Sequence, residues 1–292
     1  MSTTAQLQWT PQASQIAREA GATLREFFAK GVETEYKGEA DLVTIADRTS
    51  EKLIRTRLSE AFPTHGIFGE EGTRDRLESE YRWYIDPLDG TTNFAHGHPQ
   101  FCVSMGLEHR PAGTAPEADG KLVAAVIYDP LRDELYQAER GCGATLNGRP
   151  IHVSRIAHLA ESISATGFPS RKRHLSPNVY FYHEFTLRSH GVRRAGSAAL
   201  DLAYVAAGRL DAFWEFNLNP WDTAAGILLV EEAGGQVTGF FGQHYLIDSQ
   251  QVLASNGLIH NELLQTFEEL FAGRNLAPIL PPQDFVQQLR KP

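Results

Sequence analysis

Residues 83–94 read Trp-Tyr-Ile-Asp-Pro-Leu-Asp-Gly-Thr-Thr-Asn-Phe and carry the strongest signal in the chain. An apolar run with the composition of a β-strand ends here in two carboxylates, Asp86 and Asp89. Taken alone, Asp-Pro-x-Asp-Gly is also an ordinary turn composition. With Glu70 upstream, however, these carboxylates would concentrate negative charge at one point unless a cation is bound. Because the ligands are oxygens, the pattern predicts Mg²⁺, or Mn²⁺, rather than zinc.

Gly90, Thr91 and Thr92 follow directly after the second carboxylate. A turn into a helix at this point would direct backbone N–H groups outward as an anion site. A phosphate held there would adjoin the cation, and the Thr91 hydroxyl could orient a water molecule for in-line attack. The stretch therefore predicts the hydrolysis of a phosphate ester.

A second acidic element lies at residues 219–226, where Asp222 stands at the start of an apolar helix. Two interpretations stay open for Asp222, a helix N-cap and a functional carboxylate. The sequence offers no motif for a covalent mechanism, because Ser197 is not in a nucleophile elbow and no GxxxxGK[ST] loop occurs.

Composition narrows the class of protein. The chain has 292 residues, of which 42% are apolar and 22% charged, as in a folded soluble protein. Its 27 Lys and Arg against 36 Asp and Glu give a net charge of −9, which disfavours a nucleic-acid or membrane-surface partner. Cys102 and Cys142 form no zinc or disulfide framework, and no signal segment or apolar run of ~18 residues is present. A cytoplasmic location is therefore expected.

Hydrophobic patterns predict layers of helices and sheets, with Thr10 as the first N-cap and Asn147-Gly148 as a hairpin turn. The best boundary follows Ser154 and gives two halves, residues 1–154 and 155–292, acting as one catalytic unit. The expected helices are 11–30, 49–62, 178–190, 198–207, 224–233 and 261–271. The expected strands are 83–85, 101–107, 122–128, 134–138, 162–166, 211–215, 236–238 and 252–255.

These motifs resemble those of the inositol monophosphatase family, within the lithium-sensitive, magnesium-dependent phosphatases. The family's Asp-Pro-(Ile/Leu)-Asp-Gly-Thr-Thr-Asn-Phe, after a Trp and an apolar strand, is matched by residues 83–94. Its Trp-Asp, followed by small residues and Glu-Ala-Gly-Gly, is matched by residues 221–235, and residues 69–71 and 40–47 match two further motifs. The resemblance implies an α+β fold, a layered αβαβα sandwich as in inositol monophosphatases and fructose-1,6-bisphosphatase, with the metal motifs divided between the two halves.

The resemblance also implies roles for individual residues. Two or three Mg²⁺ ions per site would be bound by Glu70, Asp86, the Leu88 carbonyl, Asp89 and Asp222. The catalytic residues would be Thr91 and Asp47, which orient the attacking water, and Glu70. The substrate, a small phosphorylated polyol, would be bound by Leu88, Asp89, Gly90, Thr91, Gly196, Ser197, Ala198, Glu215 and Asp222.

The implied activity is Mg²⁺-dependent hydrolysis of myo-inositol monophosphate in a lithium-sensitive homodimer. Residues 216–220 depart from the Met-Gly-Ile-His-Cys-type stretch of the animal enzymes, beside the expected polyol pocket, so fructose 1,6-bisphosphate and histidinol phosphate stay open as substrates. Thr92 stands where phosphatases of adenosine 3',5'-bisphosphate usually have Lys, which disfavours that substrate. A regulatory role through protein partners is the other alternative, since some bacterial relatives attach to the transcription machinery.

Overall fold

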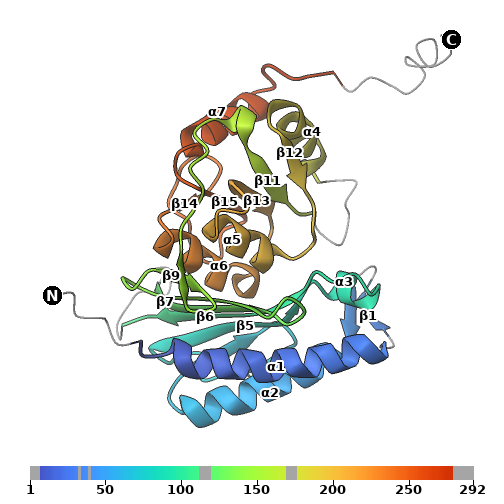
Figure 1. Cartoon of the computed structure of the whole chain (residues 1–292), viewed down its shortest axis with the longest axis vertical. Helices are drawn as coiled ribbons and strands as arrows, with labels where there is room; N and C mark the ends of the chain where they lie inside the picture. Colours follow the sequence, from blue (N-terminus) through green and yellow to red (C-terminus); the bar gives the residue numbers. More distant parts are fainter. Residues whose placement is uncertain (1–6, 32–33, 39–40, 112–119, 169–175, 279–292) are drawn as a thin grey trace.

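The computed structural model describes residues 7–31, 34–38, 41–111, 120–168 and 176–278. Its elements are stacked in five layers (Figure 1): a helix pair, a first sheet, a second helix pair, a second sheet and a third helix pair. This is the layered α+β sandwich that the sequence predicts.

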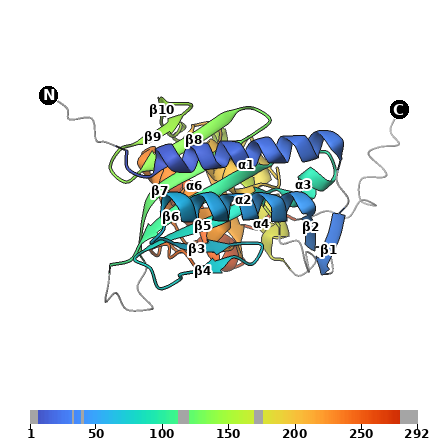
Figure 2. The same ribbon diagram turned by 90° about the horizontal axis from the view of Figure 1, so that it is seen from below.

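The first sheet has eight strands in the order β10-β9-β8-β7-β6-β5-β3-β4. Its strands pair antiparallel, except that β3 and β5 are parallel. Helices α1 (Thr10–Lys30) and α2 (Ile45–Ala61) lie side by side on its outer face (Figure 2). The strands are β3 Gly66–Gly69, β4 Arg74–Asp75, β5 Tyr81–Asp89, β6 Cys102–His109, β7 Lys121–Asp129, β8 Glu134–Glu139, β9 Ala144–Leu146 and β10 Arg149–Ile151, and a separate pair is β1 Thr34–Gly38 with β2 Asp41–Thr44.

The second sheet has five strands in the order β12-β11-β13-β15-β14. Helices α5 (Ala198–Ala206) and α6 (Pro220–Glu232) lie between the two sheets, and α4 (Asn178–Arg188) and α7 (His260–Phe271) cover the outer face (Figure 1). The strands are β11 Ile163–Thr166, β12 Gly191–Arg193, β13 Ala212–Phe216, β14 Gln236–Thr238 and β15 Gln251–Ser255, and the short helices are α3 Thr91–Ala95 and η1 Leu159–Glu161.

Helix α6 is buried on every side because a sheet covers each of its faces. Residues 223–230 are all buried, without the alternation of a surface helix. Small residues permit a close approach to the first sheet: a Cβ added at Gly106 of β6 would lie 2.6 Å from the Cβ of Ala224. The start of α6 is therefore fixed against β6, next to the end of β5.

Helices α2 and α6 each begin four residues before the predicted starts at 49 and 224. In α2 the Asp47 carboxylate accepts the N–H of Thr44 at 2.8 Å, and in α6 the Asp222 carboxylate accepts the N–H of Asn219 at 2.7 Å. These bonds are the N3-to-N-cap half of a capping box. The apolar pattern did not extend to these first turns: in α2 the first residue, Ile45, is 53% exposed, and in α6 only the placement of Asp222 at the helix start indicated the turn.

The prediction that Thr10 caps α1 is wrong. The N-cap residue is Trp9, and the carboxylate of Glu139, at the end of β8, binds the helix terminus instead. Glu139 accepts the N–H groups of Gln8, Trp9 and Thr10 and the Thr10 hydroxyl at 2.7–3.0 Å. The cap lies 129 residues from Thr10 in sequence, so no local pattern indicates it.

We expect Glu139→Gln to lower the free energy of unfolding by about 2 kcal/mol, because an amide cannot accept all these bonds or complement the helix dipole with its charge. Urea unfolding measures the change. Glu26→Gln is the control, since Glu26 is a carboxylate on α1 itself that is 75% exposed and lies 3.9 Å from Lys30. A Glu139→Gln midpoint equal to that of Glu26→Gln would contradict the prediction.

The predicted strands are all present, whereas β1, β2, β3, β4 and β12 were not predicted. Some of these are only two or three residues long, too short to show a period of two. Asn147 and Gly148 have φ values of 48° and 75° between β9 and β10, which confirms the predicted hairpin turn.

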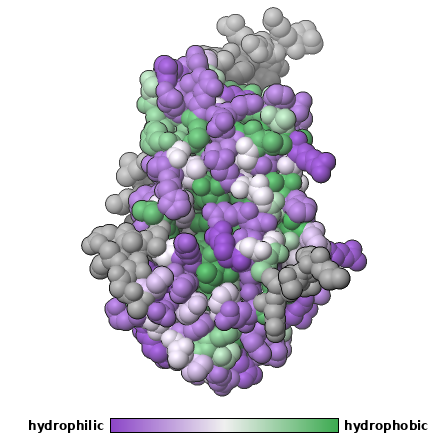
Figure 3. Space-filling model, turned by 90° about the vertical axis from the view of Figure 1, so that its left-hand side faces the viewer, coloured by the Kyte–Doolittle hydropathy of each residue, from purple (hydrophilic) through white to green (hydrophobic). Residues whose placement is uncertain are grey.

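One face of the molecule is mixed in hydropathy. On the face in Figure 3, hydrophilic side chains separate the apolar ones into patches. In the described part of the chain, no helix combines the length and the apolar character that a bilayer crossing requires.

Candidate active site

A cavity of about 180 Å³ opens at the end of β5 and draws its walls from both sheets and from α5 and α6. Among the described residues lining it, Arg194 is the one cation. The carboxylates that line the cavity are Glu70, Asp86, Asp89, Asp201, Glu215 and Asp222.

A β-bulge brings the two carboxylates of β5 to the same face of the first sheet. Asp86 pairs with Ser104 and Asp89 with Cys102, so a step of three residues on β5 spans two on β6. Residues three apart on a regular strand point to opposite faces, and the extra residue restores a common face. Pro87 lies inside the bulge, where a missing N–H costs no ladder bond.

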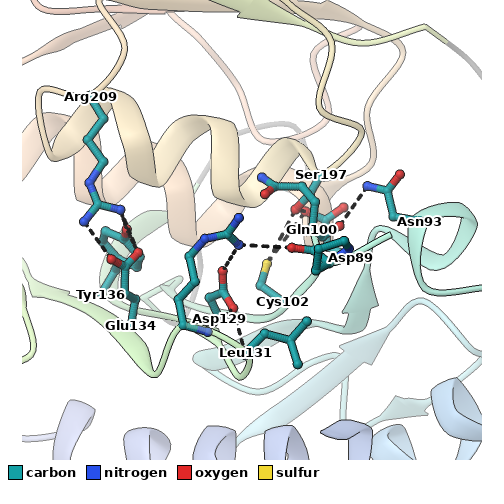
Figure 4. Close-up of polar contacts among 12 residues, drawn as sticks. Asp89, Asn93, Gln100, Cys102, Asp129, Leu131, Glu134, Tyr136, Ser197 and Arg209 are labelled. Atoms are coloured by element: carbon teal, nitrogen blue, oxygen red, sulfur yellow. Dashed lines mark hydrogen bonds and ion pairs between the residues drawn. The ribbon is translucent and has the colours of Figure 1, made fainter. Parts of the chain in front are cut away.

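Asp89 is held in place by the start of α5 (Figure 4). Its Oδ2 accepts the Ser197 hydroxyl at 2.6 Å and the Ala199 N–H at 2.8 Å, and the Cys102 Sγ lies 3.8 Å away. Burial raises the pKa of Asp89, and these hydrogen bonds partly oppose the rise. Ser197 is only 1% exposed, so its hydroxyl is committed to Asp89.

Thr91 and Asp47 meet beside the bulge. The Thr91 Oγ1 lies 3.1 Å from Asp47 Oδ1 and 3.1 Å from the Leu88 carbonyl oxygen, so its single proton can go to either acceptor. The other Asp47 oxygen accepts the N–H and hydroxyl of Thr44 at 2.8 and 2.6 Å. Burial raises the pKa of Asp47, although the bonds from Thr44 and Thr91 lower it. One oxygen of Asp47 is therefore anchored while the other faces Thr91.

The turn from β5 into α3 requires glycine at position 90. Gly90 has a φ of 99°, and a Cβ there would lie 2.7 Å from the carbonyl oxygen of Gln100. Asn93, on α3, donates its side-chain amide to the carbonyl oxygens of Gln100 at 2.7 Å and Ala195 at 2.9 Å. This amide joins α3 to the segment that contains Gly196. Asn93 belongs to the motif that the sequence singled out, but no role was predicted for it.

Negative charge is in excess in the cavity, whose lining has six carboxylates and one arginine among the described residues. Burial, together with the charges of Glu70, Asp89 and Asp222, raises the pKa of Asp86 well above its usual value. Burial and Asp89 raise the pKa of Asp222 to about 7, although the bonds from Asn219 lower it. The N-cap of α6 is Asn219, so the N-cap interpretation of Asp222 is wrong; Asp222 supports the helix start from the N3 position and also faces the cavity.

The donor set of this cavity fits a hard divalent cation by its chemistry. The available ligands are carboxylate oxygens and the carbonyl of Leu88, which are the ligands Mg²⁺ and Mn²⁺ prefer. Within the described ranges, no group of three or more His, Cys, Asp or Glu side chains is already arranged as a metal site. Burial and the neighbouring carboxylates raise the pKa values of Asp86 and Asp222, and a bound cation would oppose both effects by stabilising the ionised forms.

Glu215 on β13 and Asp201 on α5 also line the cavity. Burial and the charge of Asp201 raise the pKa of Glu215, and Arg194 lowers it. Gly167 makes room for Glu215, because a Cβ there would lie 2.2 Å from its carboxylate oxygens. Asp201 was not predicted. Its position one helical turn after Ser197, with an acidic side chain in an otherwise apolar helix, is the signal that could have found it.

The structure brings all the predicted site residues together. Asp47 reaches the cavity through Thr91. The other predicted residues line it directly: Glu70, Asp86, Leu88, Asp89, Gly90, Thr91, Gly196, Ser197, Ala198, Glu215 and Asp222.

Known proteins share this arrangement of sequence and fold. The model of the inositol monophosphatase family matches residues 5–272. The chain belongs to the inositol monophosphatase family. An inositol-1-monophosphatase from Mesorhizobium japonicum is 42% identical over 264 residues, 89% of this chain and 96% of the relative. The Nus factor SuhB of Pseudomonas aeruginosa is 44% identical over 252 residues, 84% of this chain and 86% of the relative.

A solved structure agrees with these sequence matches. The crystal structure of the extragenic suppressor protein suhB from Bartonella henselae has a TM-score of 0.81 and 42% identity, covering 89% of this chain and 98% of that chain. Membership of the inositol monophosphatase family indicates a metal-dependent phosphatase with a small phosphorylated substrate. The names of the relatives differ, so the family alone does not select the ester.

Proposed function

We propose that the chain is a Mg²⁺-dependent phosphomonoesterase that hydrolyses myo-inositol monophosphate to inositol and phosphate. The observation that carries the proposal is the meeting of two groups at one cavity: Asp86 and Asp89 on one face of β5, and the Thr91–Asp47 hydrogen bond beside them. The first group can bind a hard cation and the second can orient a water molecule. Together they suffice for hydrolysis without a covalent intermediate.

The metal ligands in this proposal are Glu70, Asp86, Asp89, Asp222 and the Leu88 carbonyl, which would hold two or three Mg²⁺ ions or, alternatively, Mn²⁺. When bound, these ions neutralise the phosphate oxygens and lower the pKa of a bound water. The bulge and the bonds from Ser197 and Ala199 keep Asp89 directed at the cavity before any ion binds.

The chain's own residues orient the attack. The Thr91 hydroxyl donates a hydrogen bond to Asp47. The lone pairs of Thr91 Oγ1 are then free to accept a hydrogen bond from the attacking water, which orients it. The N–H groups of Gly90 and Thr91 bind the phosphate. Glu70, which lines the cavity, is the third catalytic residue of the proposal and also a metal ligand.

The polyol part of the substrate would lie against Glu215, which accepts hydrogen bonds from its hydroxyls, and against the backbone of Gly196 and Ala198. Ser197, which lines the cavity between them, stays a predicted substrate contact, and its hydroxyl supports Asp89. Residues 1–154 and 155–292 act as one catalytic unit because both supply walls of the cavity. A homodimer, inhibition by lithium and a cytoplasmic location are further parts of this proposal and rest on the family.

We expect the Mg²⁺ concentration for half-maximal activity to fall as pH rises from 6 to 8. The Asp222 carboxyl, with a pKa of about 7, is mostly protonated at pH 6 and mostly ionised at pH 8, and only the ionised form binds metal. The change is up to about tenfold per pH unit below 7, since one proton competes with the ion. Titrating Mg²⁺ at several pH values measures it. A half-saturating concentration that does not depend on pH would contradict the role given to Asp222.

The activity is tested by phosphate release from myo-inositol 1-phosphate, fructose 1,6-bisphosphate, histidinol phosphate and adenosine 3',5'-bisphosphate, with Mg²⁺ or with EDTA. Preference for the inositol ester supports the proposal. Preference for another ester retains the metal mechanism and changes the substrate. Release that is unaffected by EDTA would overturn the metal dependence.

A regulatory role through protein partners is the second candidate, because a 44% identical relative is named Nus factor SuhB. The complete set of carboxylates at the cavity favours the enzyme. A folded protein that releases no phosphate from any of these esters would favour the regulatory role instead.

A further inference from the structure

Three polar side chains on one face of α2 each hold a different segment of the candidate active site. Asp47 bonds to Thr91, and the hydroxyl of Ser50 donates to the carbonyl of Pro87 in the β5 bulge at 2.9 Å. The third is Glu51, one turn after Asp47. All three side chains are 4% exposed or less, so they form a buried polar stripe beneath the cavity-lining segments.

Glu51 binds the loop that follows β3 with both of its oxygens. Its Oε2 accepts the N–H of Glu71 at 2.7 Å, and its Oε1 accepts the N–H and hydroxyl of Thr73 at 2.9 and 2.7 Å. Gly69 allows this approach, because a Cβ there would lie 2.5 Å from Glu51 Oε2. A buried carboxylate with three donors is well satisfied and holds its partners in one geometry.

These bonds fix the backbone on both sides of Glu70. The peptide group before Glu70 donates its N–H to the carbonyl of Ile85 on β5 at 3.2 Å. The peptide group after it donates the Glu71 N–H to Glu51. Because both flanking peptide planes are held, the direction of the Glu70 side chain toward Asp86 and the cavity is set in advance.

We propose that Glu51 is a positioning residue that presents Glu70 to the cation in the cavity. The inference rests on the proposed function, in which Glu70 is a metal ligand. Groups that orient metal ligands typically contribute about ten- to a hundredfold to metal affinity. Glu51 would act in this way through the backbone rather than by touching the ion.

The test is Glu51→Gln, which keeps the shape but sets an NH₂ group against at least one of the three donors. We expect the Kd for Mn²⁺, measured by calorimetry on the full chain, to rise about tenfold. We also expect faster amide hydrogen exchange in residues 69–74. The Mn²⁺ effect should vanish when Glu51→Gln is made in a Glu70→Gln background, since Glu51 acts through Glu70.

Glu139→Gln is the matched control, because Glu139 is also 4% exposed and also accepts backbone N–H groups at a helix-packed site. It should lose stability without changing the Mn²⁺ Kd or the exchange of residues 69–74. A folded Glu51→Gln protein with wild-type values of both would overturn the proposal. If Glu51→Gln does not fold, Thr73→Val removes one of the three donors, and an unchanged Mn²⁺ Kd there would overturn it equally.

Failure of the proposed function gives a different result. Wild-type protein that binds no Mn²⁺ would remove Glu70 from the role of metal ligand, and the proposal for Glu51 would fall with it. If wild type binds Mn²⁺ and Glu51→Gln speeds exchange without changing the Kd, the loop contact exists but does not position a ligand. That result would overturn the inference and leave the proposed function intact.

Discussion

Asp89→Asn is expected to reduce phosphate release about 10³-fold at saturating Mg²⁺, because a metal-binding charge contributes several kcal/mol to stabilising the transition state. In the wild-type protein the Ser197 hydroxyl and the Ala199 N–H donate hydrogen bonds to Asp89 Oδ2. The side-chain carbonyl of an asparagine can accept the same two bonds. The variant should therefore fold, and what it loses is the charge facing the cavity. Phosphate release and thermal unfolding, measured together, separate these two effects.

Asp211→Asn is the control for the loss of a buried carboxylate, and it is the more demanding change because Asp211 accepts its two bonds on separate oxygens. Asp211 is 6% exposed against 9% for Asp89, and it too accepts one serine hydroxyl, from Ser154, and one backbone N–H, from Ile163. It does not line the cavity. A loss of activity as large in Asp211→Asn would point to stability rather than metal binding, and full activity in Asp89→Asn would exclude Asp89 from the ligand set.

Thr91→Val is expected to lower kcat by about 10²-fold or more while the Kd for Mn²⁺ stays near wild type, since a positioned acid–base group contributes about 10²–10⁴-fold. Valine keeps the shape but removes the hydroxyl that bonds to Asp47 Oδ1 and to the Leu88 carbonyl. The change leaves the metal-binding carboxylates in place, and it removes one hydrogen bond to the Leu88 carbonyl. Steady-state kinetics and calorimetry with Mn²⁺ give the two numbers.

Thr186→Val on α4 is the control for the loss of a hydroxyl, because Thr186 donates to the Tyr182 carbonyl at 2.6 Å, away from the cavity. Adding Asp47→Asn to Thr91→Val should cost little more than either change alone, because the two residues act as one unit. Additive losses would show that Asp47 acts independently of Thr91.

The sequence was sufficient to predict the elements that depend on short, continuous stretches of residues. Residues 83–94 predicted a strand that ends in carboxylates, followed by a turn into a helix, and the structure has these elements. The spacing of Asp86 and Asp89 did not show that both face the same way, since that depends on the bulge. Pro87 within a strand was an available signal for the bulge, because a strand interior rarely accepts proline.

Contacts between segments that are far apart in the sequence could not be predicted. Glu51 lies 20 residues from Glu71, and Glu139 lies 129 residues from Thr10, so neither role has a pattern in sequence. The same holds for Ser197, whose hydroxyl donates a hydrogen bond to Asp89, 108 residues away. Sequence reasoning therefore found the groups that face the cavity more readily than the groups that hold them.

In the proposed function, Gly167 affects substrate recognition, through Glu215, and not the hydrolytic step. Its missing side chain is what lets the Glu215 carboxylate occupy its place, since even a methyl group would lie 2.2 Å from those oxygens. A single substitution at Gly167 would displace Glu215 and leave the carboxylates of β5 and α6 where they are. Selection acting on this one codon could therefore redirect the fold to new esters without rebuilding its hydrolytic machinery.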